Sequence, residues 1–104
     1  MNSNTGRAVN EIAVELAATG EGTLVRRFLE SILTPRELEE VAGRWELVKL
    51  LDQGVSQRVV AKRLGMSLCK ITRGSRELKK KDSAFKAVLE RHARRHRGPD
   101  GGHA

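Results

Sequence analysis

Polar and basic side chains gather near the middle of the chain at spacings that suit the recognition of nucleic acid. Ser56 and Ser67 can each cap a helix, and Gly65 lies between these helices, where a reversing chain needs a left-handed backbone. The apolar residues that would face inward are Val60, Ala61, Leu64 and Ile71. The residues that the second helix would expose are Cys69, Lys70, Thr72 and Arg73. The pattern predicts a helix-turn-helix over about residues 57–80, whose second helix fits a DNA major groove; the alternative is an ordinary helical hairpin with a solvated polar face.

The positive charge of the chain is confined to its second half. Residues 1–54 hold six Lys and Arg against nine Asp and Glu, whereas residues 55–104 hold fourteen against four. The net charges are therefore −3 and +10, and the predicted helix-turn-helix lies in the basic half. We expect a polyanion as the partner, because an anionic membrane would require a broad apolar face that the basic half lacks.

Length and aromatic content limit the core that a monomer can bury. The 104 residues suit a single domain, but they include only two Phe, one Trp and no Tyr. We therefore expect a homodimer, in which pairing completes the core. A single cysteine, Cys69, excludes an internal disulfide and fits a reducing cytoplasm. No stretch has the length of a membrane span or the pattern of a signal peptide, so we expect a cytoplasmic protein without a membrane partner.

Apolar spacing along the rest of the chain predicts helices and no strand, so the expected fold class is all-α. A capping box of Thr34, Pro35 and Glu37 starts a long helix. The last helix becomes rich in Arg and His over residues 91–97, where it extends the positive surface. The expected segments are a disordered N-terminus at 1–7, a helical domain at 8–97 and a disordered tail at 98–104. Within the domain we expect helices at 8–19, 23–32 and 34–54, two helices within 57–80, and a last helix from Asp82-Ser83 onward.

Short motifs between Leu24 and Leu89 follow one another in a distinctive order. They are Leu33-Thr34-Pro35, Arg44, Ser56-Gln57-Arg58, Leu64-Gly65 and Ile71-Thr72-Arg73-Gly74-Ser75. Together they resemble the bacterial Trp repressor family, and the last block is far more specific than a helix-turn-helix alone. The resemblance implies an intertwined all-helical homodimer that binds double-stranded operator DNA of tryptophan biosynthesis genes. It also implies L-tryptophan as a corepressor ligand, and no cofactor beyond it.

The resemblance further implies which residues hold the ligand. Arg44 and Arg73 match two arginines on either side of the indole ring, and Arg73 also meets the ligand carboxylate. Guanidinium groups suit both tasks, since they stack on aromatic faces and present paired donors. The alternative for Arg44 is a solvated helix residue that pairs with Glu40, four positions earlier.

Four further residues complete the implied ligand site. Thr34 matches a hydroxyl near the carboxylate. Ser31 and Leu33 match backbone carbonyls at a helix end, where an ammonium is favoured. Gly74 has no side chain, so a flat ligand or a phosphate can approach its backbone.

The chain departs from the family's pattern in three places. Glu77 stands where the family has a serine near the ligand ammonium, so its carboxylate could take that ammonium or pair with Arg73, four residues earlier. Lys70 replaces a threonine and faces either the ligand or DNA. The segment 54–56 is one residue shorter than in the best-known member, which would tilt the DNA-reading helices.

Residues that match the family's operator contacts begin the first motif helix. Arg58 is the best candidate for a paired contact to guanine, with a phosphate contact as the alternative. Lys79-Lys80-Lys81 should meet phosphates, with a solvated charge run as the alternative, and Leu68 could instead be partly buried. The expected DNA contacts are Gln57, Arg58, Met66, Ser67, Leu68, Cys69, Lys70, Thr72, Arg73, Lys79 and Lys80.

Catalytic chemistry has little support in the sequence. His92, His96 and His103 lie in the basic end without a cysteine or carboxylate cluster at metal-ligand spacing, so we expect neither an enzyme nor a metal site. One rival function is a ligand-independent helix-turn-helix protein, either of the transposase type or a relative that ignores tryptophan. The other is a basic RNA-binding protein, which the scarcity of stacking aromatic residues disfavours.

Overall fold

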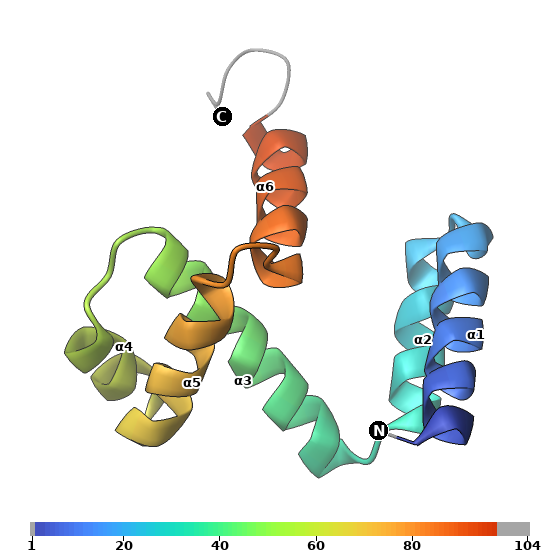
Figure 1. Ribbon diagram of the computed structural model, residues 1–104, viewed down its shortest axis with the longest axis horizontal. Coiled ribbons are helices and arrows are strands. Elements are labelled where there is room, and N and C mark those ends of the chain that lie inside the picture. The colour runs from blue at the N-terminus through green and yellow to red at the C-terminus, as the bar shows by residue number, and fades with distance from the viewer. Residues whose placement is uncertain (1, 98–104) are drawn as a thin grey trace. The chain divides into compact units, whose positions relative to one another are not determined.

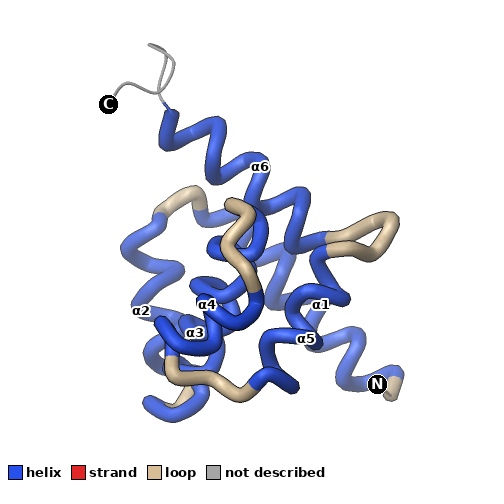
Figure 2. Tube along the Cα trace, turned by 90° about the vertical axis from the view of Figure 1, so that its left-hand side faces the viewer, coloured by secondary structure: helices blue, strands red, loops and turns tan. Residues whose placement is uncertain are grey.

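The computed structural model describes residues 2–97, and these residues form six helices without a strand, which confirms the all-α class. In chain order the helices are α1 (Ser3–Thr19), α2 (Gly22–Ile32), α3 (Pro35–Asp52), α4 (Gln57–Leu64), α5 (Leu68–Leu78) and α6 (Ala84–Arg97) (Figure 1). Short loops join them (Figure 2). The chain divides into two units, residues 1–39 and 40–104. The tail that we expected to be disordered, 98–104, lies outside the described residues.

The first unit contains an antiparallel pair of helices, α1 and α2 (Figure 1). Helix α1 begins at Ser3, so the expectation of disorder is wrong for residues 3–7. The reason is a local cap: the amide of Thr5 donates a hydrogen bond of 2.8 Å to Oδ1 of Asn2, which satisfies one donor of the first turn. The helix ends at Gly20, whose φ of +63° is the left-handed conformation that glycine adopts without steric cost.

No side chain of α1 or α2 is buried within this unit. Between the two helices lies a groove of about 320 Å³, whose lining residues are Glu11, Ile12, Glu15, Leu16, Thr19, Leu24 and Phe28. Val9, Val14 and Ile32 are also about half exposed. The first unit therefore presents apolar surface that its own helices do not cover.

The start of α3 has the capping box that the sequence predicts. The amide of Glu37 donates to Oγ1 of Thr34 at 3.1 Å, and the amide of Thr34 donates to Oε1 of Glu37 at 2.8 Å. Each side chain thus satisfies a backbone donor of the other residue, with Pro35 in the first helical position. These two hydrogen bonds fix the backbone at the start of α3.

The second unit has a small core to which each of its four helices contributes. The buried side chains are Leu47 and Val48 of α3, Val60 of α4, Ile71 of α5 and Leu89 of α6. Val60 and Ile71 have no exposed surface, which confirms that they face inward. Ala61 and Leu64 pack against this core half-buried.

A tight turn joins α4 to α5, and each of these helices begins at the serine cap that the sequence predicts. Oγ of Ser56 accepts from the amide of Val59 at 3.3 Å, and Oγ of Ser67 accepts from the amide of Lys70 at 3.4 Å. Gly65 has a φ of +64°, and the next amide returns to the carbonyl of Ala61 at 3.1 Å. The reversal thus depends on the left-handed conformation of Gly65.

Helix α6 is held on α3 by one polar and one aromatic contact. Nζ of Lys86 lies 2.7 Å from Oδ1 of Asp52. Near the middle of α3, the ring of Trp45 meets that of His92 edge to face, with centroids 5.5 Å apart. Within residues 2–97, no helix combines the length and the apolar character that crossing a bilayer requires.

Candidate nucleic-acid and ligand interface

The first turns of α4 and α5 expose most of the side chains that the sequence assigns to DNA contact. The exposed ones are Arg58, Ser67, Leu68, Cys69, Lys70, Thr72 and Arg73. Leu68 is 56% exposed, so the alternative of partial burial does not hold for it. The start of α5 therefore offers two hydroxyls, a thiol, two cations and an apolar side chain, a mixture that suits base edges and thymine methyl groups.

One hydrogen bond ties the two helices of this surface together. The hydroxyl of Thr72 donates to Oε1 of Gln57 at 3.4 Å. Gln57 is half-buried at the start of α4, and Thr72 is exposed one turn into α5. The contact keeps the beginning of α4 beside the face of α5 that carries the candidate base contacts.

Met66 packs inward, which the sequence did not predict. It lies half-buried against the core, and a Cβ added to Gly43 of α3 would come within 2.5 Å of its Cε. Part of the Met66 side chain is thus used in packing against the core, which its assignment to DNA contact did not include. The reason is that Gly43 leaves room on α3 for the methionine side chain.

Few acidic groups neutralise the cations of the second unit. Among the residues that the structure describes, Lys49, Lys80 and Lys86 are the cations of this unit that form ion pairs. Arg58, Lys79 and the other exposed cations of α4 and α5 form none within residues 2–97. Their charge is directed to solvent, where it attracts anions.

Glu77 pairs with Lys80 and not with Arg73. Oε2 of Glu77 lies 2.8 Å from Nζ of Lys80, three residues along the chain. This hydrogen bond lowers the pKa of Glu77 below 4.5, and the charges of Lys80, Arg73 and Arg76 act in the same direction. Glu77 is therefore ionised at neutral pH, beside a lysine that we expected to meet phosphate.

Arg44 and Arg73 are exposed, and neither forms an ion pair within residues 2–97. The alternative in which Arg44 pairs with Glu40 is thus not formed. Each guanidinium is free to stack on a ring or to meet a carboxylate.

The missing side chain of Gly74 is explained by helix packing. A Cβ at this position would lie 2.7 Å from Cδ1 of Leu47, a core residue of α3 that is 2% exposed. The expectation that Gly74 opens its backbone to a ligand or phosphate is therefore corrected: the free space is filled by Leu47. Arg73 precedes Gly74 in α5, and Arg44 lies one helical turn before Leu47 in α3, so both arginines belong to the turns that form this close approach.

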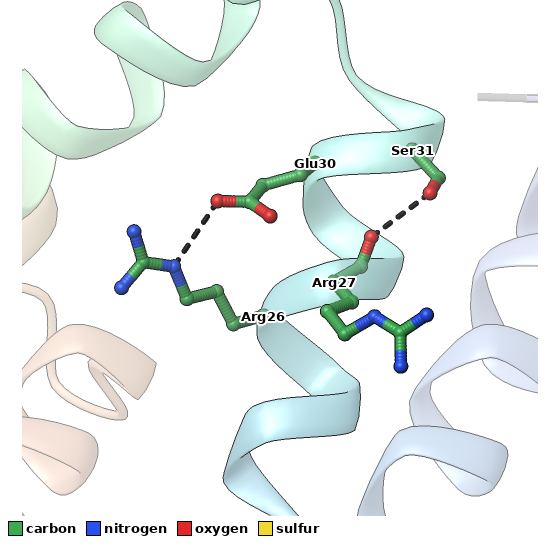
Figure 3. Close-up of polar contacts among 4 residues, drawn as sticks. All are labelled: Arg26, Arg27, Glu30 and Ser31. Atoms are coloured by element: carbon green, nitrogen blue, oxygen red, sulfur yellow. Dashed lines mark hydrogen bonds and ion pairs between the residues drawn. The ribbon is translucent and has the colours of Figure 1, made fainter.

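The three candidate ligand residues of the first unit lie around the end of α2. The hydroxyl of Ser31 donates to the carbonyl of Arg27 at 2.9 Å, next to an ion pair between Arg26 and Glu30 (Figure 3). The Thr34 hydroxyl already accepts the amide of Glu37, but it keeps its own proton to donate. The carbonyls of Ser31 and Leu33 lie at the C-terminal end of a helix, where the dipole favours a cation.

The two histidines of α6 lie together without forming a recognisable metal site. Their ring centroids are 4.2 Å apart, and Nδ1 of His96 lies 3.0 Å from the carbonyl of His92. In the described part of the chain, no group of three or more His, Cys, Asp or Glu is placed to hold a metal ion. Partial burial lowers the pKa of His92 below 6.5, and the charges of His96, Lys49 and Arg95 add to the shift.

Sequence reasoning did not find the contact between Trp45 and His92, because 47 positions separate them and no local pattern links them. Helical spacing gave the only signal, since His92 follows Phe85 and Leu89 on the inward side of α6. The contact matters to the site because it holds α6 on the helix that carries Arg44.

These features define a class of small, all-helical chains with a basic pair of capped helices and a tight glycine turn. Comparison with protein families gives a match over residues 8–93 to the family described as Trp repressor protein. The chain belongs to this family.

Several curated relatives are named Trp operon repressor homolog. The relative from Chlamydia trachomatis serovar L2 is 39% identical over 56 residues, 53% of this chain and 60% of the relative. That from Vibrio cholerae is 42% identical over 62 residues, 59% of this chain and 60% of the relative. The one from Chlamydia trachomatis serovar D is 36% identical over 70 residues, 62% of this chain and 74% of the relative. The chain thus spans about three fifths of the first relatives, and no solved structure matches it.

Proposed function

We propose that the chain is a transcriptional repressor that binds double-stranded DNA through α4 and α5 as a helix-turn-helix. The observation that carries this proposal is the exposed and unpaired set of cations around the first turns of the two helices. The start of α5 would enter the major groove, where Lys70 and Thr72 reach base edges. Arg58 at the start of α4 would bind guanine, and Lys79 would bind a phosphate.

We further propose L-tryptophan as the ligand that activates DNA binding. Family membership supports this assignment, as does the exposure of Arg44 and Arg73 without ion-pair partners in the described residues. An indole between two guanidinium groups beside α5 would fix the angle of that helix. A ligand that fits one orientation of α5 better than others shifts the population toward it, and DNA must then tighten ligand binding by the same factor.

A homodimer would complete the first unit. The groove lined by Ile12, Leu16, Leu24 and Phe28 leaves apolar surface uncovered within residues 1–39. A second copy of the chain would remove this surface from water, and its twofold symmetry would present two reading helices to two half-sites. Sedimentation that finds a folded species of one chain at micromolar concentration would contradict the dimer.

A calorimetric titration with L-tryptophan, followed by a gel shift on duplex DNA with and without it, tests the ligand assignment. We expect saturable binding that Arg73→Ala abolishes and that Arg76→Ala, an exposed arginine on the same helix, leaves in place. We also expect tryptophan to raise DNA affinity about 5- to 150-fold, the usual range for coupled sites. If millimolar tryptophan gives no heat and no change in DNA affinity, tryptophan is not the ligand.

The ionised Glu77 favours a second candidate, a DNA-binding protein that needs no ligand. Its carboxylate, held by Lys80, lies four residues beyond Arg73 and adds a negative charge near the group that would meet the ligand carboxylate. The substitution Glu77→Ser separates the two candidates. If tryptophan acts on this variant but not on the wild type, the carboxylate has closed the ligand site and the native protein is ligand-independent.

A further inference from the structure

The last two turns of α6 carry a cluster of arginines on one face of the helix. Arg91, Arg94 and Arg95 are exposed, and their spacing of three and four residues makes them neighbours on the helix surface. The inward side of the same helix carries Phe85, Leu89 and His92. The arginines therefore form a separate outward face, which we call the α6 basic face.

Glu90 is the one carboxylate beside this face on α6 in the described residues, and it forms no ion pair with Arg91, Arg94 or Arg95 there. Glu46, Asp52 and Glu77 are already paired with lysines, and none of the three arginines forms an ion pair within residues 2–97. Like charges one turn apart destabilise a helix, and the helix dipole offsets this only for Arg94 and Arg95, which lie in the last turn of α6, and not for Arg91. An anionic partner would remove this repulsion.

The α6 basic face is held in place, and it lies on the part of α6 that projects away from α4 and α5. Lys86 and Asp52 fix the beginning of α6, while the contact of Trp45 with His92 holds its second half on α3. The two views agree that the C-terminal end of α6 projects away from α4 and α5 (Figures 1 and 2). Arg95 lies nine residues beyond Lys86, about 14 Å along the helix. The C-terminal half of α6 therefore extends away from the reading helix, toward phosphates beyond those that flank it.

We propose that the α6 basic face binds phosphates of duplex DNA outside the segment that α4 and α5 read. This inference rests on the proposed function, to which it adds a second contact area. Planar guanidinium groups give paired hydrogen bonds to phosphate oxygens, and such contacts position a protein without reading sequence. Single-stranded RNA is a poorer fit, since Phe28, Trp45 and Phe85 are all half-buried and offer no open stacking surface.

The test compares the full-length triple variant R91A/R94A/R95A with the matched control R7A/R27A/R36A, which removes three exposed arginines from the first unit. The probes are random-sequence duplexes of about one and about three helical turns, titrated at several salt concentrations. On the longer duplex we expect the triple variant to reduce the slope of log affinity against log salt by about two to three units, near 0.9 per lost phosphate contact. The shorter duplex is too short to be bound by α4–α5 and by the α6 basic face at once, so on it the triple variant should differ from the control by much less. R91K/R94K/R95K, which keeps the charges, should retain most of the slope.

Equal salt slopes for the triple variant and the control on the longer duplex would overturn the inference while leaving DNA binding by α4 and α5 intact. A loss confined to a structured RNA probe, or to vesicles containing phosphatidylserine, would also overturn it and assign the face to that partner. If the wild type binds neither duplex, the proposed function fails. Circular dichroism of each variant establishes that the helices are retained.

Discussion

At the scale of single residues, two glycines lie at close contacts with α3: Gly74 of α5 against Leu47, and Gly43 of α3 against Met66. A Cβ on Gly74 would meet Leu47, which is buried in the core, whereas one on Gly43 would meet only the terminal methyl group of Met66. Protein interiors are packed closely enough that one added carbon has to displace its neighbour. The two glycines should therefore differ in their tolerance of alanine, although both lie inside helices.

We expect Gly74→Ala to lower the free energy of unfolding by about 1–2 kcal/mol, because the overpacking cost exceeds the gain in helix propensity of about 1 kcal/mol. Gly43→Ala should change it by less than about 1 kcal/mol, because the flexible end of Met66 can move aside. Urea unfolding of the two variants measures both values. A Gly74→Ala protein at least as stable as the wild type would show that α5 does not pack on Leu47 as described.

Arg58 and the lysines after α5 should differ in what they contribute to DNA binding. Arg58→Ala should cost about 1–3 kcal/mol on a preferred sequence and reduce discrimination among sequences, because a paired contact to guanine is lost. Replacing Lys79 and Lys81 by alanine should weaken binding to all duplexes alike and reduce the salt slope by about one unit per lost phosphate contact. Competition titrations with preferred and random duplexes measure both effects. If Arg58→Ala also weakened binding equally on preferred and random duplexes, Arg58 would be reassigned to a phosphate contact.

At the scale of elements, we expect the attachment of α6 to α3 to depend on pH through His92. Partial burial beside Trp45 and Lys49 keeps the pKa of His92 below 6.5 in the folded chain, with His96 and Arg95 on α6 acting in the same direction. The unfolded chain lacks these influences and binds more protons below pH 6.5. This contribution to stability is therefore complete above that pH and is lost as the pH falls through the folded-state pKa of His92.

The fluorescence of Trp45, the only tryptophan, should report this titration directly. We expect a change in intensity with a midpoint below pH 6.5 in the wild type, and its disappearance in His92→Gln. His96→Gln should move the midpoint upward, since it removes one of the charges that oppose protonation of His92. An unchanged titration in His92→Gln would mean that another group is responsible.

Elements set by local chemistry could be predicted from the sequence. The caps at Ser56 and Ser67, the turn at Gly65 and the capping box of Thr34 and Glu37 each involve residues within a few positions of one another. The helical start at Ser3 was missed because the polar first turn has no apolar stripe, although the Asn2 cap is a local signal.

Features of the site that depend on distant neighbours could not be predicted in the same way. Met66 turns inward because Gly43 lies across from it, and Gly74 is required by Leu47, 27 positions earlier. Glu77 had two cations within one helical turn, Arg73 before it and Lys80 after it, and helical spacing alone does not choose between them. The exposure of the candidate side chains on α4 and α5 could be predicted, because the caps fix where each helix begins and therefore which residues face outward.

At the scale of the whole molecule, the proposed function assigns DNA reading to the second unit and dimerisation to the first. The excess of basic residues lies in the second unit, and the uncovered apolar groove lies in the first. A twofold dimer of such chains would read two half-sites about one turn of DNA apart. This prediction concerns the sequence pattern in the DNA and can be checked without knowing the regulated genes.

The most direct test is selection of bound sequences from a randomised duplex pool by the full chain, with and without L-tryptophan. We predict that tryptophan enriches a twofold-symmetric sequence whose half-sites lie about 10 base pairs apart, and that enrichment is much weaker without it. If no sequence is enriched in either condition, the chain does not read DNA through α4 and α5, and the proposed repressor function is contradicted.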